Sequence, residues 1–407
     1  MSKLDELIAE LCPDGVEYKT LGTICEIRSG WGFPNIEQGK TSGEYPFYKV
    51  GDMNSFGNEF VMTVANNYVD LETATRLRCK PAPKGTVIFP KIGAAIGTNK
   101  KRILAQEACY DNNIIGLIPS DAVISRYLFY QMEAVNLMRF ADYSGAMPSI
   151  RKTTLEKFRI PVPPLPVQQE IVRILDNFTE LTAELTAELT ARRKQYEYYR
   201  DLLLTFDDKP EVKWMTLGEI CKKVSSGGTP PTSNKEYYGG NVPWLRTQEV
   251  DFNYIYDTGV KITEAGVKNS SAKWIPENCV IVALYGATAA KVAINKIPLT
   301  TNQACCNLQV DETKALYRYV FHWLSSQYLK LKALGQGSQS NINAKTVKEY
   351  PIPVPPLEEQ ERIVAILDRF DALCNDLTSG IPAEIEARQK QYEYYRDKLL
   401  SFKEVTA

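Results

Sequence analysis

The sequence predicts an α+β protein with an internal pseudo-twofold repeat, in which two mixed α/β domains are joined by two long antiparallel helices that form a coiled-coil spacer. Three observations carry this prediction. A proline-rich motif occurs twice, a long amphipathic pattern follows each copy, and a block of short β-rich runs precedes each copy. The length of 407 residues suits two or three domains, and the charged fraction of 24% is ordinary for a globular protein.

The repeat is clearest in two motifs that flank the amphipathic pattern. IPVPPL spans residues 160–165 and again 352–357, and KQYEYYRD spans residues 194–201 and again 390–397. The copies are 192 residues apart at the first motif and 196 at the second, so the second copy holds four extra residues. The helical segments are nearly identical while the blocks before them have diverged. The repeat therefore predicts one scaffold that carries two different binding surfaces.

Each proline motif leads into a long helix. Apolar residues recur three and four positions apart, which is typical of a helix with one apolar face, and Pro166 can occupy the first helical turn. About 40 residues at ~1.5 Å each give a helix of about 60 Å. Such a helix cannot bury its apolar stripe alone, so we expect the two copies to pack against each other. Packing of each helix on its own domain is the alternative. Gly380 and Pro382 predict a break in the second helix.

The blocks before the helices combine strands, helices and polar loops. GTVIFPKIG (85–93) and CVIVALYG (279–286) are typical of strands bounded by Gly and Pro, and residues 126–140 and 317–334 suit helices late in each block. The predicted segments are an N-terminal helical segment (1–18), a first domain (19–159), a first spacer helix (160–206), a linker (207–212), a second domain (213–350) and a second spacer helix (351–407).

The net charge of −1 hides a segregation of charge along the chain. Residues 19–159 hold 18 Lys and Arg against 13 Asp and Glu, and residues 213–350 hold 16 against 10. The remaining segments are strongly acidic. The two basic blocks are therefore candidates to face phosphate, whereas the acidic segments, which DNA repels, are expected to meet protein or solvent.

The residues that commonly build metal sites, disulfides or membrane spans are sparse. Nine cysteines without paired spacing and a single histidine, His322, predict reduced, mostly buried thiols and no metal site. No apolar run approaches the ~20 residues of a membrane span, and the first residues lack the apolar core of a signal peptide. We therefore expect a cytoplasmic protein without membrane contact.

Taken together, these motifs resemble the specificity subunit of type I restriction–modification enzymes. The resemblance rests on paired domains, each followed by IPVPPL, a glutamine-containing helix start (Gln168-Gln169-Glu170 and Glu359-Gln360) and a long helix that ends in KQYEYYRD. It spans essentially the whole chain, and the opening LIAELCPDGVEYKTLG is also similar. Tandem TAEL units at 182–185 and 186–189 resemble the spacer repeats of one branch of the family.

The resemblance implies a division of labour. Such a subunit binds double-stranded DNA and two methyltransferase subunits, and motor-nuclease subunits complete the enzyme. Each domain would be a target-recognition domain for one half of a split site. Neither the Asp/Asn-Pro-Pro-Tyr/Phe element of adenine methyltransferases, nor a glycine-rich cofactor loop, nor a P-loop occurs in the sequence. We therefore expect a non-catalytic subunit with no catalytic residues and no cofactor.

Candidate DNA contacts lie in polar loops of the two basic blocks, where side chains supply donors for base edges and phosphates. In the first domain they form a basic, glycine-flanked segment, and in the second they lie in PWLRTQEV and in later loops. A solvated surface loop is the alternative for each. The candidates are Lys91, Asn99, Lys100, Lys101, Arg102, Arg246, Gln248, Lys291, Asn302, Gln303 and Asn341.

The tyrosines of the two KQYEYYRD motifs fall in the helices, so a role in the core or at a subunit interface is favoured over stacking on nucleic acid. We expect Tyr196, Tyr199, Tyr392 and Tyr395 to take part in binding the partner. Two other protein classes stay open. A two-domain repressor would bind DNA without a partner, and a coiled-coil scaffold would not bind DNA at all.

Overall fold

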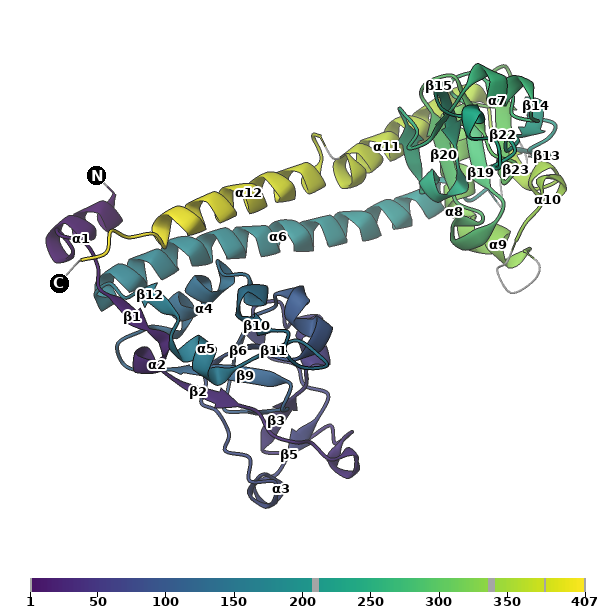
Figure 1. The fold of residues 1–407 in the computed structure, drawn as a ribbon. Coiled ribbons are helices and arrows are strands. Elements are labelled where there is room, and N and C mark those ends of the chain that lie inside the picture. Colours follow the sequence, from purple (N-terminus) through teal and green to yellow (C-terminus); the bar gives the residue numbers. More distant parts are fainter. Residues whose placement is uncertain (1, 207–211, 336–340, 377, 406–407) are drawn as a thin grey trace. The chain divides into compact units, whose positions relative to one another are not determined.

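The computed structural model describes residues 2–206, 212–335, 341–376 and 378–405 (Figure 1). The chain forms two compact units: unit 1 is Met1–Glu184 with Ile385–Ala407, and unit 2 is Leu185–Glu384. Each unit thus contains one globular domain and parts of both long helical segments.

The globular part of unit 1 consists of short strands and helices. Its elements are α1 (Lys3–Leu11), β1 (Tyr18–Thr20), α2 (Leu21–Ile24), β2 (Cys25–Ser29), η1 (Asn35–Glu37), β3 (Tyr45–Tyr48), η2 (Val50–Asn54), β4 (Val61–Met62), β5 (Tyr68–Val69), α3 (Leu71–Arg76), β6 (Val87–Pro90), η3 (Gly93–Thr98), β7 (Arg102–Leu104), β8 (Cys109–Tyr110), β9 (Ile114–Pro119), α4 (Ser125–Glu133), η4 (Leu137–Phe140), β10 (Ala141–Asp142), β11 (Ser149–Ile150), α5 (Lys152–Glu156) and β12 (Arg159–Pro161).

The globular part of unit 2 follows a similar order. Its elements are β13 (Lys213–Thr216), β14 (Cys221–Ser226), η5 (Lys235–Tyr237), β15 (Tyr238–Leu245), η6 (Thr247–Glu249), β16 (Asn253–Ile255), β17 (Lys261–Ile262), α7 (Glu264–Lys268), β18 (Trp274–Ile275), β19 (Val280–Ala283), η7 (Gly286–Thr288), β20 (Val292–Asn295), β21 (Leu299–Thr301), β22 (Cys305–Val310), α8 (Tyr317–Ser326), α9 (Tyr328–Ala333), α10 (Ala344–Lys348) and β23 (Pro351–Val354).

The two domains share one sheet topology although their sequences have diverged. The main sheet has the order β2-β9-β6-β7-β4 in unit 1 and β14-β22-β19-β20-β16 in unit 2. In both sheets the first three pairings are antiparallel and the last is parallel. The strands predicted at 85–93 and 279–286 are the central strands β6 and β19. The predicted repeat and mixed α/β class are confirmed.

Each domain is an insertion whose two ends meet beside a long helix. The strand that enters the domain pairs antiparallel with the strand that leaves it, β1 with β12 in unit 1 and β13 with β23 in unit 2. The prolines of IPVPPL lie in and after the leaving strand, and α6 begins at Leu165 with Pro166 in its first turn, as predicted. The extended proline segment therefore turns the chain from the sheet into the helix.

One helix in each domain is packed between the main sheet and a long helix. In unit 1, α4 contacts β6, β7 and β9, and its buried side chains share a core with the start of α6. In unit 2, α8 contacts β19, β20 and the helix α11 (Leu357–Asn375). Both α4 and α8 bury six consecutive residues. Burial of each large apolar side chain contributes about 1.5–3 kcal/mol, so these helices fasten each domain to its long helix.

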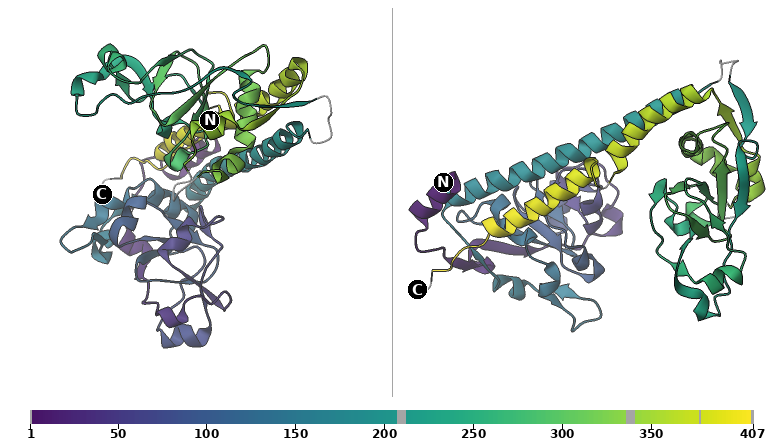
Figure 2. Two further views of the ribbon diagram at one scale, coloured as in Figure 1. Left: turned by 90° about the vertical axis from the view of Figure 1, so that its right-hand side faces the viewer. Right: turned by 90° about the horizontal axis from the view of Figure 1, so that it is seen from above.

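The long helices run antiparallel, as the sequence predicts. The first is α6 (Leu165–Leu203), an unbroken helix of 39 residues. In unit 1, Phe178 near the start of α6 stacks on Tyr395 near the end of α12 (Ile381–Leu399), with ring centres 5.5 Å apart. In unit 2, Tyr199 near the end of α6 stacks on Phe370 of α11 at 5.7 Å. Figures 1 and 2 show the unit 1 portions of α6 and α12 side by side.

The break predicted at Gly380 and Pro382 is confirmed, since α11 ends at Asn375 and α12 begins at Ile381. A Cβ atom on Gly380 would lie 2.6 Å from the carbonyl oxygens of Ala372 and Asp376, so glycine is required at this close approach. The start of α11 lies 192 residues after the matching start of α6, and the motif at the end of α12 lies 196 residues after the matching motif of α6. The break therefore accommodates the four extra residues of the second copy.

The carboxylate of Asp376 organises the turn inside this break. It accepts hydrogen bonds from the Ser379 hydroxyl at 2.5 Å and from the hydroxyl and backbone N–H of Thr378 at 2.6 and 2.8 Å. These bonds lower the pKa of Asp376 to about 2. The side chain thus stays ionised and caps a non-helical turn over the physiological pH range.

Candidate nucleic-acid interface

The shared topology places one loop at the same position in both domains. The loop follows β6 in unit 1 and β19 in unit 2, and each copy starts at a glycine with positive φ, 70° at Gly93 and 78° at Gly286. Among the described residues, no heavy atom lies within 4 Å of a Cβ built on Gly286, and the nearest to one on Gly93 is the Met147 sulfur at 4.0 Å. A glycine backbone that is open on this side allows close approach of a ligand, so we take these loops as the centre of the candidate interface.

The basic segment that follows Gly93 is partly turned inward. Lys101 is only 3% exposed, and its ammonium donates to the amide oxygen of Asn99 at 2.8 Å and to the Val135 carbonyl at 2.7 Å. Burial lowers the pKa of Lys101 to about 8. The same Asn99 oxygen accepts the Leu137 N–H at 2.8 Å, and Asn99 has a left-handed backbone with φ 55°. Lys101 and the side-chain oxygen of Asn99 therefore hold the loop in shape.

The other three residues of this segment differ in how their charge is used. Arg102 donates to the carbonyl oxygens of Lys101 at 2.7 Å and of Met53 at 3.1 Å, which is a structural use of its guanidinium. Lys91 donates to the Ser29 hydroxyl at 3.0 Å, and Lys100 donates to the side-chain oxygen of Asn54. Because serine and asparagine are neutral, neither hydrogen bond balances the charge of Lys91 or Lys100.

In unit 2, hydrogen bonds connect the loops that carry the candidate DNA-contacting residues to the loop at η6. The Asn302 N–H donates to the Leu245 carbonyl at 2.9 Å, directly before Arg246. The Thr288 hydroxyl of η7 donates to the Thr247 carbonyl at 2.8 Å. The Gly286 N–H donates to the side-chain oxygen of Asn341 at 3.2 Å, and the Thr229 hydroxyl donates to Gln303. Arg246, Gln248, Asn302, Gln303 and Asn341 thus belong to one connected set of loops.

The side chains of this set are not equally accessible. Gln248, Gln303 and Asn341 are exposed. The Arg246 side chain is 40% exposed and its Nε lies 3.8 Å from Glu249, a loose pair. Lys291 is paired with Asp251 at 2.6 Å, so its charge is already balanced. The amide oxygen of Asn302 accepts the Ala304 N–H at 3.2 Å and shapes its own turn.

Comparison of the two domains adds Lys49 to the candidates, a residue that the sequence-based prediction does not include. Lys49 directly follows β3 as Arg246 follows β15, and in both places the backbone N–H donates to an acidic side chain three residues on, at 2.6 and 3.2 Å. The Lys49 ammonium donates to the neutral Gln38 amide at 2.9 Å. The signal was present in the sequence, where PFYKVGD (46–52) aligns with PWLRTQE (243–249).

The tyrosines proposed for partner binding lie mainly between helices and domains. Tyr392 is 5% exposed and donates to the Glu133 carboxylate, and the Tyr196 hydroxyl lies 3.3 Å from His322 Nδ1. Tyr199 and Tyr395 are each 37% exposed and stack on the neighbouring helix. Tyr198 and Tyr394 are the most exposed tyrosines of the two motifs, at 64% and 63%.

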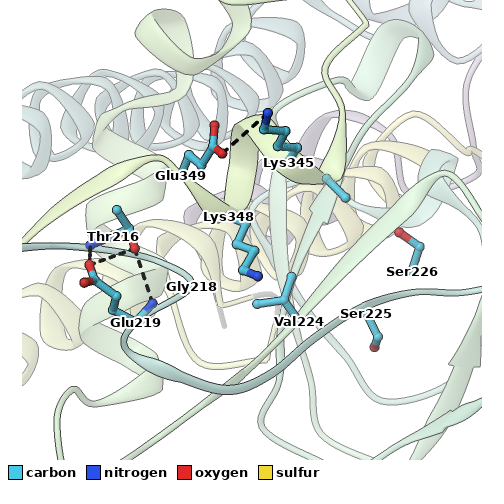
Figure 3. Close-up of a pocket in the computed structure, with 10 residues that line it drawn as sticks. Thr216, Gly218, Glu219, Val224, Ser225, Ser226, Lys345, Lys348 and Glu349 are labelled. Atoms are coloured by element: carbon cyan, nitrogen blue, oxygen red, sulfur yellow. Dashed lines mark hydrogen bonds and ion pairs between the residues drawn. The ribbon is translucent and has the colours of Figure 1, made fainter.

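A pocket of about 620 Å³ opens in unit 2 between β14 and α10 (Figure 3). Its charged side chains pair locally: Lys345 lies 3.8 Å from Glu349, and the Thr216 N–H and hydroxyl donate to Glu219 at 2.7 and 2.8 Å. The hydrogen bonds from Thr216 hold the pKa of Glu219 below its usual value. The Thr216 hydroxyl also accepts the Glu219 N–H at 3.3 Å, so this reciprocal pair caps the turn between β13 and β14.

In the described ranges, no cluster of three or more His, Cys, Asp or Glu side chains is arranged to hold a metal ion. No described helix combines the length and the apolarity needed to cross a membrane. All nine cysteines are free. All but Cys221 are buried, which agrees with the prediction of mostly buried thiols.

The sequence matches a known family over most of its length. The type I restriction modification DNA specificity domain matches twice, at residues 13–192 and 210–387. The chain is 41% identical over 289 residues to the type I restriction enzyme EcoR124I/EcoR124II specificity subunit of Escherichia coli, covering 68% of this chain and 70% of that protein. It is 28% identical over 408 residues to a putative type I restriction enzyme specificity subunit of Haemophilus influenzae, covering 95% and 96% of the two chains.

Solved structures share the fold at low sequence identity. The S subunit of the type I restriction–modification system of Mycoplasma genitalium aligns over 97% of this chain and 98% of that one, with a TM-score of 0.58 and 14% identity. A chain from a type I system solved in a study of complex assembly aligns over 95% and 98%, with a TM-score of 0.59 and 17% identity. With its two matching domains, the shared topology and the helices between them, this chain belongs to the type I restriction–modification DNA specificity subunit family.

Proposed function

We propose that each domain reads one half of a split DNA site, and that the antiparallel helices set the gap between the halves and dock two methyltransferase subunits. Motor-nuclease subunits would complete the assembly, and work on DNA would place it in the cytoplasm. The observation that carries the proposal is the identical strand order of two domains whose loops differ in sequence. Two domains that share a sheet topology but carry different loops are suited to bind two different half-sequences of one site.

The proposed DNA-contacting residues are those whose polar groups remain available on the connected loops. They are Lys49, Lys91 and Lys100 in the first domain, and Arg246, Gln248, Gln303 and Asn341 in the second. Lys and Arg would contact phosphates or guanine, and the amides of Gln and Asn suit adenine edges. Five other candidates would instead stabilise the conformation of these loops through their bonds within the protein: Asn99, Lys101, Arg102, Lys291 and Asn302.

The experiment that tests this function is co-expression with a methyltransferase subunit of a type I system, followed by mapping of methylated adenines. We expect one split motif, and no methylation or cleavage by the purified chain alone with S-adenosylmethionine, ATP and magnesium. DNA affinity should fall steeply with salt because lysine and arginine contacts release counterions. Tight sequence-specific binding without a partner would favour a repressor, and a flat salt response would favour a scaffold.

Arg246 and Lys49 occupy equivalent positions in the two domains, so substitution of either residue should affect the recognition of one half-sequence only. Arg246→Ala should weaken DNA binding about 5- to 150-fold, the equivalent of ~1–3 kcal/mol for a lost base contact, and relax the second half-sequence only. Lys49→Ala should do the same for the first. Binding to duplexes with single-base changes is the measurement, and Lys345→Ala, which removes an equal charge from α10, is the matched control. Loss of both half-sequences together would contradict the assignment.

The two exposed tyrosines should each support one methyltransferase subunit. Tyr198 and Tyr394 occupy the same place in the two motifs and are exposed to the same extent, which suits two equivalent partners. A glutamate at either position should reduce the bound methyltransferase from two copies to one, and the double variant should abolish binding, because a charge in an apolar interface must be desolvated. Native mass spectrometry of the purified complex measures the count. Two bound copies in the double variant would rule out this docking site.

A further inference from the structure

Both domains are attached to the long helices through matching polar contacts on α4 and α8, which we call the junction helices. Gln168 of α6 and Gln360 of α11 are 0% exposed and bind in the same way. The side-chain oxygen accepts the N–H of the residue before the junction helix, at 2.9 Å in both units. The side-chain nitrogen donates to the second proline carbonyl of IPVPPL, at 2.8 Å in both. The start of each junction helix is therefore fixed.

A second contact starts in the first turn of α4 and of α8 and reaches the long helix eight residues beyond the glutamine, which fixes the orientation of the junction helix. In unit 1 the Arg126 guanidinium lies 2.7 Å from the Asp176 carboxylate of α6, and in unit 2 Arg318 lies 2.6 Å from Asp368 of α11. These side chains are only 24–35% exposed. Although burial raises the pKa of Asp368, hydrogen bonds from His322 and Arg318 keep it below its ordinary value. The aspartate is thus a charged and specifically oriented partner.

A third side chain completes each cluster, and here the copies differ. In unit 1 the Tyr130 hydroxyl donates to the same Asp176 oxygen at 2.5 Å. In unit 2 the equivalent residue is His322, 0% exposed, whose Nε2 lies 2.8 Å from the same Asp368 oxygen. The other side of the His322 ring meets the Tyr196 hydroxyl of α6. In unit 2 the cluster therefore joins the domain to both long helices.

We propose that Asp176 and Asp368 are positioning residues that hold each domain at a defined rotation about its long helix, and that the accuracy of the gap length depends on them. This inference rests on the proposed function. Adjacent gap lengths differ by roughly 34–36° of DNA twist, so a domain free to rotate by that amount would accept a second gap. A directional, charge-assisted pair that spans a partly buried interface resists such rotation better than apolar packing, which has no preferred direction.

The test uses the complete complex with its methyltransferase. Methylated adenines are mapped to obtain the half-sequences and the gap, and duplexes carrying those half-sequences with the gap lengthened or shortened by one base pair are then bound. We expect Asp368→Asn to lower the ratio of binding between the native and altered gaps at least tenfold, with both half-sequences unchanged. Asp176→Asn should act in the same way. Asparagine keeps the shape and removes the charge, and Arg318→Lys, which loses the planar guanidinium, carries the test if the asparagine variant does not assemble.

Ile363→Val is the control for a general loss of stability. Ile363 is buried in the same helix α11 but lies outside the polar cluster, so this variant should keep one gap. An unchanged ratio in Asp368→Asn, or an equal loss in Ile363→Val, would overturn the positioning role, as would a wild-type complex that already accepts several gaps. A wild-type complex that methylates no split site would instead refute the proposed function itself.

Discussion

A fragment of residues 1–206 is expected to form a homodimer that directs methylation to a palindromic split site. The fragment contains the first domain and all of α6, but it lacks the portion of α12 that completes unit 1. The missing motif is repeated at the end of α6 itself, where Tyr199 stands in the place of Tyr395. In a dimer with true twofold symmetry, Tyr199 of one copy can therefore stack on Phe178 of the other.

The same exchange should satisfy the other contacts of the missing helix end, because Tyr196 corresponds to Tyr392, which donates to Glu133. Both halves of the new site would then be read by the first domain, so the expected sequence is the first half-sequence and its inverted copy. Light scattering of the fragment and methylation mapping with the methyltransferase measure the two outcomes. Tyr196→Ala with Tyr199→Ala is the matched control and should remain monomeric. A wild-type fragment that stays monomeric at high concentration would contradict the pairing of the helices.

Insertion of a third TAEL unit after Leu189 is expected to widen the gap by one base pair and to leave both half-sequences unchanged. Four residues lengthen a helix by ~6 Å and turn its far end by about 40° beyond a full turn. One base pair adds ~3.4 Å and roughly 34–36°. Rotation should decide the outcome, because a domain on the wrong face of the duplex loses its groove, whereas slight DNA bending absorbs the error in rise.

The apolar face tolerates this insertion, since Leu181, Leu185 and Leu189 already follow steps of four. The break between α11 and α12 should let each half of the second helix keep its partner on α6, because an extended loop spans up to ~3.3–3.6 Å per residue. Methylation mapping before and after insertion measures the gap. Four flexible residues placed between Thr378 and Ser379 in that break form the control and should leave the gap unchanged. A gap that ignores the helical insertion would show that α6 does not set the spacing.

The sequence by itself determined the repeat, the long helices and the break at Gly380. These features depend on local signals: the spacing of apolar residues, the position of prolines and a glycine at a close approach. The central strands β6 and β19 were predictable for the same reason, because a short apolar run between glycine and proline has few other uses. The sequence showed a glutamine at the start of each long helix. It did not show that this glutamine binds the junction helix of the domain.

Only the tertiary structure decided which members of a polar run face outward. Lys100 and Lys101 are neighbours in the sequence, yet Lys101 turns inward because the Val135 carbonyl, from the end of α4, and Asn99 receive its ammonium. In the same way Tyr198 is exposed while Tyr196 meets His322. Burial of a side chain depends on partners far along the chain, and these partners come together only when the sheets and helices pack. A linear pattern therefore identifies a candidate segment, and the packing of distant elements determines which of its side chains are exposed.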